Sequence, residues 1–298
     1  MFKKLEGIFV VMPTPFTEDE KIDYEAYGKN IDWLISKGVH GLIPLGSTGE
    51  VASLDDDERF ELAEFVVKKV DGRVPVCVGT TAETTAKTIK FTKHAEEIGA
   101  DAVLILPPYY MNPLQEEMIN HFEKISDAVK IPIMLYNNPG TAGVDMELET
   151  VLKLAGRDNI QYIKESTGDI TRLRDINRHS GGDITTFCGC EQLAFESFML
   201  GAKGWVCVAG NAAPELTVAL FEKVVYEKDY EKAKEIYEVI LPLCIELENS
   251  GKLVQLIKYC LDKQGAHGGY SRAPRLPISD ELAARIDKVL EDINSYKL

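Results

Sequence analysis

Eight short apolar runs recur along this chain, and each is followed by a stretch with helical patterning. The runs lie at residues 7–16, 41–45, 74–79, 102–106, 131–136, 160–164, 184–188 and 204–209. Each run is nearly all apolar rather than alternating, which is typical of strands buried on both faces of a parallel sheet. Helix signals lie between the runs, namely an acidic first turn at 53–58 and glycines where helices should stop, Gly38, Gly99, Gly156 and Gly201.

Eight rounds of strand and helix with right-handed crossovers close most naturally into a (β/α)8 barrel, the TIM barrel. A doubly wound open sheet is the structural alternative, but it would usually have fewer strands or a glycine-rich nucleotide fingerprint, and the sequence has neither. Three more helical stretches follow, at 230–247, 252–263 and 279–296. We therefore predict an α/β fold with a catalytic barrel over residues 1–226 and a C-terminal helical extension, residues 227–298, packed on the barrel as a cap.

The charge balance narrows the range of partners. The 298 residues include 33 Lys and Arg against 48 Asp and Glu, which gives a net charge of −15 with neutral histidines. Such an acidic chain is a poor partner for nucleic acid or for an anionic membrane surface. No stretch reaches the roughly 18 unbroken apolar residues of a membrane helix, and no long apolar run follows the first two lysines, so we expect no signal peptide.

The cysteines and histidines argue against a metal site. The six cysteines lie mostly within apolar runs, which predicts reduced, buried thiols in a cytoplasmic protein. Cys188 and Cys190 form the only close pair, no histidine is near them in sequence, and the five histidines are scattered. We therefore expect no bound metal.

The sixth run carries one lysine, Lys164, to the end of an otherwise apolar strand, where the active sites of such barrels lie. Burial disfavours a charged ammonium and so favours the neutral amine. A neutral amine can attack a ketone and form a Schiff base. The alternative is a lysine that extends from the strand end into solvent.

Other strand ends offer groups that complement this lysine. Ser47 and Thr48 follow the second run and put hydroxyl and backbone N–H groups in one tight turn, which suits a small carboxylate, although a plain turn is the alternative. Tyr136 ends the fifth run and could carry protons beside Lys164, or could be a core tyrosine. Prolines stiffen the loop that displays Tyr110 and its neighbour, residues equally suited to a subunit interface.

These groups together suit a 2-oxo acid, which presents a carboxylate next to a ketone. An imine between the lysine and the ketone acts as an electron sink and acidifies the neighbouring carbon, where a tyrosine can move protons. This is the chemistry of a class I aldolase. It needs no metal and no cofactor beyond the covalent lysine imine.

The motifs resemble those of the dihydrodipicolinate synthase / N-acetylneuraminate lyase family of Schiff-base lyases. The order and spacing match over nearly the whole chain, and the matching pieces lie at 46–50, 109–110, 136–137, 163–165, 168–169 and 272–277. The resemblance implies that Lys164 is the Schiff-base lysine and Tyr136 the catalytic tyrosine. It also implies that Ser47 and Thr48 bind the substrate carboxylate.

The same resemblance implies an assembly. Tyr110 matches a tyrosine that reaches into the neighbouring subunit's site to complete a proton relay, so at least a homodimer is expected. The family is usually a homotetramer built as a dimer of dimers. Gly189 and Val206 match positions that line the pyruvyl pocket.

Departures from the family pattern bear on the substrate. Thr141 stands where true synthases carry an arginine that holds the carboxylate of aspartate semialdehyde. Ser47 replaces the synthases' threonine and is closer to the sialic-acid lyases, yet the sugar-contacting positions of those lyases are not reproduced, since the chain has Cys190-Glu191-Gln192 and Val208 there. Feedback-lysine positions hold Val51, Asp56 and Arg59, so we do not expect that regulation.

Three hypotheses follow. The first is a lyase of aldolase, dehydratase or deaminase type acting on a 2-keto-3-deoxy sugar acid or related hydroxylated 2-oxo acid, with Thr141, Ser166 and Glu191 contacting hydroxyl groups. The second is dihydrodipicolinate synthase itself, which condenses pyruvate with aspartate semialdehyde, with Arg172 or Arg174 replacing the missing arginine. The third is a catalytically silent barrel used for binding.

Overall fold

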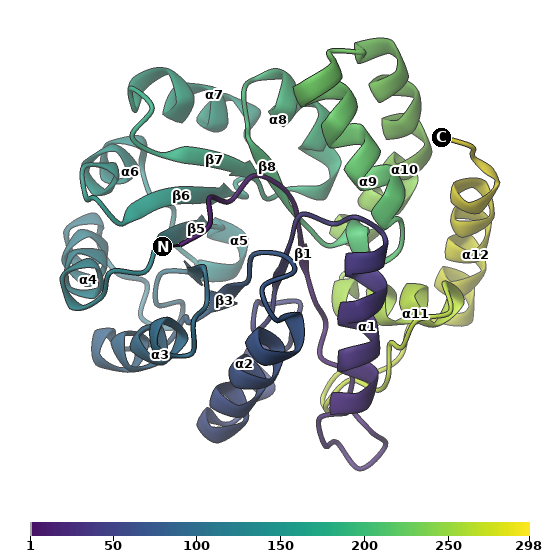
Figure 1. Cartoon of the computed structure of the whole chain (residues 1–298), viewed down its shortest axis with the longest axis horizontal. Helices are drawn as coiled ribbons and strands as arrows, with labels where there is room; N and C mark the ends of the chain where they lie inside the picture. The colour runs from purple at the N-terminus through teal and green to yellow at the C-terminus, as the bar shows by residue number, and fades with distance from the viewer. Residues whose placement is uncertain (1) are drawn as a thin grey trace.

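A ring of parallel strands forms the centre of the computed structural model, which describes residues 2–298 (Figure 1). Within those residues the sheet has eight strands in the hydrogen-bonded order β2-β1-β8-β7-β6-β5-β4-β3. A parallel bridge between Leu42 and Val76 brings β2 to β3 and closes the ring. The predicted (β/α)8 barrel is confirmed. Its strands are β1 (Gly7–Val11), β2 (Gly41–Ile43), β3 (Cys77–Gly79), β4 (Ala102–Ile105), β5 (Ile133–Asn137), β6 (Ile160–Glu165), β7 (Thr185–Cys188) and β8 (Gly204–Cys207).

Proline trims several strands relative to the predicted runs. The run 7–16 is a strand only to Val11, and Pro13 and Pro15 follow. The run 41–45 ends as a strand before Pro44, and the run 74–79 becomes a strand only after Pro75. Proline has no N–H to donate to a strand ladder, so it stands at strand ends.

Helices surround the ring, and side-chain caps fix where many of them begin. Asp23, Thr84 and Asp169 each accept a hydrogen bond from a backbone N–H in the first turn of the following helix, which satisfies a donor that has no partner within the helix. The outer helices are α1 (Tyr24–Ser36), α2 (Asp56–Val70), α3 (Thr85–Glu97), α4 (Gln115–Ala128), α6 (Leu148–Ala155), α7 (Ile170–His179), α8 (Ala194–Met199) and α9 (Pro214–Phe221). Short elements are α5 (Pro139–Ala142), η1 (Val51–Ser53), η2 (Glu191–Leu193), η3 (Ala209–Asn211) and the π-helical η4 (Glu222–Glu227).

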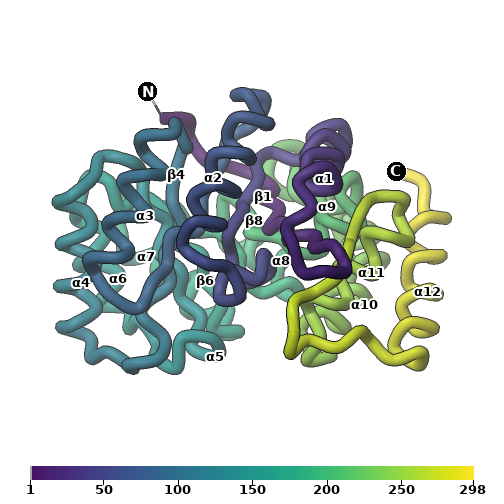
Figure 2. The backbone as a smooth tube through the Cα atoms, turned by 90° about the horizontal axis from the view of Figure 1, so that it is seen from below, coloured from purple at the N-terminus to yellow at the C-terminus, as the bar shows by residue number. Residues whose placement is uncertain are grey.

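Three further helices lie on one side of the barrel, α10 (Tyr230–Asn249), α11 (Leu253–Lys263) and α12 (Asp280–Ser295) (Figures 1 and 2). Their buried apolar side chains, including Ile240, Ile257 and Ile286, belong to the same continuous core as the barrel strands. The domain boundary between residues 226 and 227 stays a prediction. None of the helices within residues 2–298 combines the length and the apolar character that crossing a bilayer requires.

Aromatic side chains fill the barrel interior below the site. Phe187 packs edge-to-face on both Phe9 and Tyr162, with ring centroids 5.7 and 5.9 Å apart. Gly41 and Gly204 make room for these rings, because a Cβ on either glycine would overlap Phe9 or Phe187. These aromatic rings fill the interior of the barrel. The functional groups of this architecture gather beyond them, at the carboxyl ends of the strands.

Candidate active site

Lys164 and Tyr136 lie side by side at the carboxyl ends of β6 and β5. The two residues are register partners in the parallel ladder, so their side chains leave the sheet on the same face. The Lys164 Nζ lies 4.0 Å from the centroid of the Tyr136 ring, a distance at which the ring face attracts a cation. Lys164 is 7% exposed and Tyr136 6%. The lysine therefore remains in the barrel and does not extend into solvent.

The hydroxyl of Tyr136 has a partner that the sequence analysis missed. Asn138 Nδ2 donates a hydrogen bond to the Tyr136 hydroxyl oxygen at 2.9 Å. Asn138 also caps α5, because its Oδ1 accepts from Thr141 N at 3.1 Å. The phenol oxygen is thus an acceptor from Asn138, and its own proton is left to point elsewhere. An Asn before a helix that begins with Pro139 was the available sequence signal for the cap, but not for the contact with Tyr136.

The loop after β2 places Ser47 and Thr48 through unusual backbone geometry. Leu45 and Glu50, on either side of them, have φ of 61° and 57°, a left-handed conformation that non-glycine residues seldom adopt and that clusters at functional sites. Gly79, at the end of β3, is required there, because a Cβ on it would overlap the Leu45 carbonyl. Thr48 is buried and Ser47 is exposed.

A cavity of about 210 Å³ joins these strand ends. Tyr136, Ser47 and Thr141 line it, so the structure brings three of the predicted residues together. The remaining lining residues are Leu45, Gly46, Val51, Ala52, Gly79, Thr81, Leu104, Leu106, Tyr109 and Arg275. Tyr109 faces this cavity, whereas Tyr110 is 84% exposed and lies outside it.

Gly189 packs directly against Lys164. A Cβ on Gly189 would overlap Ser166 Oγ and would lie 2.8 Å from both the Glu165 carbonyl oxygen and Lys164 Cγ. Within residues 2–298, the Ser166 hydroxyl is buried and has no hydrogen-bond partner. An unpaired buried hydroxyl is unfavourable, and Ser166 lies next to Lys164 without lining the cavity.

Glu191 does not contact the cavity, contrary to the expectation that it would hold substrate hydroxyls. Its Oε1 accepts from Val208 N and its Oε2 from Ala209 N, both at 2.8 Å. The carboxyl group therefore braces the loop after β8. Burial raises the pKa of Glu191 to about 8. Val206 in β8 is fully buried. Residues two apart in a strand point to the same face, so Val206, like Gly204, faces the barrel interior. It does not line the cavity.

Arg172 and Arg174 do not line the cavity, although either was expected to replace the arginine that is missing at the position of Thr141. Arg172 forms an ion pair with Asp145, 2.7 Å from its Nη2, and Arg174 pairs with the neighbouring Asp175. The arginine that does line the cavity is Arg275, from the segment between α11 and α12. More than a hundred residues separate it from Thr141, and although the 272–277 piece matches the family pattern, nothing in the sequence indicated that Arg275 faces this cavity.

Arg275 is held by a buried ion pair. Lys258 Nζ lies 2.5 Å from Glu50 Oε1, and Arg275 Nη1 lies 3.4 Å from Glu50 Oε2. The side chains of Glu50 and Lys258 are almost wholly buried. Burial lowers the pKa of Lys258 to about 8. The carboxylate that follows the Ser47–Thr48 turn is thus tied to the C-terminal extension.

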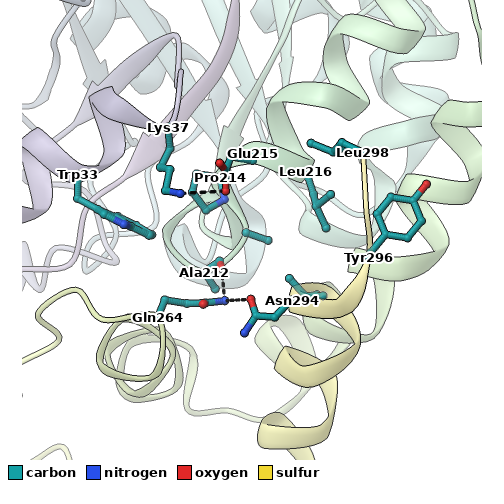
Figure 3. Close-up of a pocket in the computed structure, with 12 residues that line it drawn as sticks. Trp33, Lys37, Ala212, Pro214, Glu215, Leu216, Gln264, Asn294, Tyr296 and Leu298 are labelled. Carbon is teal, nitrogen blue, oxygen red and sulfur yellow. Dashed lines mark hydrogen bonds and ion pairs between the residues drawn. The ribbon is translucent and has the colours of Figure 1, made fainter.

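A second hollow, of about 360 Å³, lies between α1, the start of α9 and the chain's C-terminal helices (Figure 3). Lys37 and Glu215 pair across it at 3.1 Å, and Gln264 donates to Asn294 at 3.1 Å. It contains none of the residues predicted for the site. In the part of the chain that the structure describes, no group of three or more His, Cys, Asp or Glu side chains is arranged to hold a metal ion.

Known proteins resemble this chain over nearly its whole length. The model of the dihydrodipicolinate synthetase family matches residues 4–293. A curated 4-hydroxy-tetrahydrodipicolinate synthase from Pseudomonas putida is 38% identical over 275 residues, 92% of each chain. A solved structure from Pseudomonas aeruginosa superposes with a TM-score of 0.94 at 38% identity, covering 97% of this chain and 100% of that one.

A third relative was solved with a ligand. The dihydrodipicolinate synthase of Acinetobacter baumannii, complexed with pyruvate, has a TM-score of 0.93 at 30% identity and covers 98% of this chain and 99% of its own. The chain therefore belongs to the dihydrodipicolinate synthetase family and is a class I lyase of the kind that acts on pyruvate through a lysine Schiff base.

Proposed function

We propose that the protein is a 4-hydroxy-tetrahydrodipicolinate synthase, which joins pyruvate to aspartate semialdehyde. The observation that carries this proposal is the buried Lys164 against the ring of Tyr136, because Tyr136 lines the same cavity as Ser47 and an arginine. The lysine suits a 2-oxo acid, and the arginine suits a second substrate with a carboxylate. The curated relatives carry the same name.

The reaction begins at Lys164. Its amine nitrogen attacks the pyruvate ketone carbon, the oxygen leaves as water, and an imine forms. Ser47 and Thr48 hold the carboxylate through hydroxyl and backbone N–H groups. Gly189 keeps the space beside Lys164 open, and the unpaired Ser166 hydroxyl donates to the bound acid.

Tyr136 then moves the protons. The Tyr136 hydroxyl gives its proton to the oxygen that leaves as water, so the imine forms in its protonated state. This imine withdraws electrons, and the methyl group beside it passes a proton to the Tyr136 oxygen and becomes a nucleophilic enamine carbon. This carbon attacks the aldehyde carbon, and the aldehyde oxygen takes a proton from the Tyr136 hydroxyl. Asn138 holds the phenol oxygen in place. The imine itself is the electron sink, so the proposed reaction uses no separate cofactor.

The proposed assembly is at least a homodimer. Tyr110, Met111 and Leu114 are 84%, 60% and 64% exposed, which is unusual for neighbouring large apolar side chains. We infer that a second copy covers them and that Tyr110 completes the proton relay of its neighbour's site, in a dimer of dimers. The six cysteines are free and five are buried, which supports a cytoplasmic location.

A second candidate function is cleavage of a hydroxylated 2-oxo acid, such as a 2-keto-3-deoxy sugar acid. The observation that favours it is the set of neutral hydroxyl groups on Thr81, Tyr109 and Thr141 in the cavity lining. These groups can bind sugar hydroxyls, whereas Thr141 cannot hold a carboxylate as an arginine does.

Two measurements test these proposals. Borohydride reduction with pyruvate should add one reduced pyruvate to the wild type and to the exposed control Lys153→Met, and none to Lys164→Met. Absence of the adduct in the wild type would support the silent barrel. Coupled assays with pyruvate plus aspartate semialdehyde, and with a panel of 2-keto-3-deoxy sugar acids, then decide between the two activities. Turnover of a sugar acid without synthase turnover would overturn the first proposal.

A further inference from the structure

We infer that Arg275 binds the anionic group of the second substrate. It would take the role of the arginine that true synthases carry at the position of Thr141. Arg275 is thus the specificity-determining residue for a carboxylated aldehyde. The inference rests on the proposed function of the same site and assigns to the C-terminal extension a part in substrate choice.

The first argument is position. Arg275 and Thr141 line the same cavity, together with Ser47 and Tyr136. Among the described residues that line this cavity, Arg275 alone carries a formal charge at neutral pH. The other lining side chains are apolar or carry a neutral hydroxyl, so any anionic group beyond the imine has one cation to approach.

The second argument is hydrogen-bonding capacity. A guanidinium has five N–H donors in a planar fork that fits a carboxylate. Within residues 2–298, the Arg275 side chain donates one hydrogen bond, from Nη1 to Ser53 Oγ at 3.1 Å. The side chain is 29% exposed, and no other hydrogen bond within residues 2–298 uses its remaining donors.

The third argument is charge balance. Glu50 pairs with Arg275 at 3.4 Å, and its Oε1 already pairs with Lys258 at 2.5 Å. Two cations therefore surround one buried carboxylate, and the group of three keeps a net positive charge beside the cavity. An anionic substrate group would neutralise this excess, which makes its binding favourable in a partly buried site.

The fourth argument is rigidity. The segment that carries Arg275 is fixed on both sides, since Tyr270 N donates to Phe16 O at 2.9 Å and Lys252 Nζ donates to Leu276 O at 3.0 Å. Arg272 also forms an ion pair with Glu58 of α2. The guanidinium is therefore preorganised, which reduces the entropy lost on binding.

The test compares a charged and a neutral aldehyde. In Arg275→Gln, kcat/KM for aspartate semialdehyde should fall about 10- to 100-fold, chiefly through a higher KM, while kcat/KM for butanal should stay unchanged. Arg275→Lys should keep part of the preference for the charged aldehyde. An equal fall for both aldehydes, or no fall for either, would overturn the inference.

A matched control separates recognition from loosening of the segment. Arg272→Gln removes an ion pair from the same segment, yet Arg272 does not line the cavity. It should leave the ratio of the two kcat/KM values unchanged. Borohydride trapping of pyruvate should succeed in all three variants, which shows that the Lys164 site is intact.

A binding readout keeps the inference testable if the protein turns over no aldehyde. 2-Oxoglutarate and 2-oxobutyrate can both form the Lys164 imine, but only 2-oxoglutarate carries a distal carboxylate. For each protein, the concentration of 2-oxoglutarate that gives half-maximal trapping is divided by the corresponding concentration of 2-oxobutyrate. This ratio should be lower in the wild type than in Arg275→Gln. If the ratio is the same in both proteins, the role of Arg275 is refuted. If the ratio differs between them but the wild type turns over no aspartate semialdehyde, only the proposed synthase activity is refuted.

Discussion

Asn138 donates a hydrogen bond to the hydroxyl oxygen of Tyr136 at 2.9 Å, and this contact fixes the direction in which the phenol can give its proton. Asn138 is thus a positioning residue for Tyr136. The backbone supports it, because the same side chain caps α5 through Thr141 N.

The first prediction concerns Asn138→Asp. Aspartate keeps the acceptor for Thr141 N but cannot donate to Tyr136 when ionised, so kcat should fall about tenfold, the equivalent of one lost hydrogen bond. The alkaline limb of the pH–rate profile should move to higher pH, because a neighbouring carboxylate disfavours a phenolate. Steady-state kinetics from pH 6 to 10 measure both, and pyruvate trapping should be unchanged. A fall in kcat with an unmoved profile would mean that Asn138 acts only on the fold.

The second prediction concerns Gly189→Ala. The new methyl group would overlap Ser166 Oγ and press on the Glu165 carbonyl, which is backbone and cannot move away easily. We expect the free energy of unfolding to fall by about 1–3 kcal/mol and pyruvate trapping to be lost, because Lys164 Cγ is displaced. Urea denaturation and borohydride trapping measure the two effects. Gly156→Ala is the control, since a Cβ there meets only the Lys153 carbonyl oxygen at 3.4 Å, and it should retain trapping.

The third prediction concerns the buried pair of Lys258 and Glu50. Lys258→Met should lower the free energy of unfolding by about 3–5 kcal/mol, because it strands a buried carboxylate. Adding Glu50→Gln should restore part of that loss, so a double-mutant cycle in urea should give a coupling energy of about 1–3 kcal/mol. The exposed pair of Lys263 and Asp287 is the control, with an expected coupling below about 1 kcal/mol. Additive losses at Lys258 and Glu50 would contradict the ion pair.

The fourth prediction concerns the pH dependence of stability through Glu191. Burial raises its pKa from 4.5 to about 8 in the folded protein. Between these values the folded state keeps a proton that the unfolded state has lost, so the free energy of unfolding falls as pH rises. Glu191→Gln removes this titration. The stability of the wild type relative to this variant should therefore decline from pH 5 to pH 8.

Urea unfolding at several pH values measures this difference. Glu149→Gln, at an exposed position of α6, should run parallel to the wild type. Parallel curves for the wild type and Glu191→Gln would contradict the protonated carboxyl group.

The sequence alone was enough to predict the barrel and to place Ser47, Tyr136 and Lys164 at the ends of its strands. Each strand appears as an apolar run, because both faces of a parallel sheet are buried. The carboxyl ends of parallel strands converge, so the residues that follow the runs, among them Ser47, Tyr136 and Lys164, could be placed together from order alone. The contact of Asn138 with Tyr136 was missed, because sequence spacing does not say where a capping side chain directs its remaining donor.

The tertiary structure decided the charges around the site. The order of the strands predicts that the ends of β2, β5 and β6 lie together, but three charged residues lie outside these ends, namely Arg275, Glu191 and Lys258. Hydrophobic periodicity does not predict which partner or cavity each of their side chains contacts. Arg172, which is closer in sequence to the site, pairs with Asp145 instead. A buried charge is stable only with a partner, and the choice of partner depends on how segments distant in sequence pack. The pattern of apolar residues therefore determined the fold, whereas the pairing of buried charges, and with it the cation that faces the cavity, followed from the packed structure.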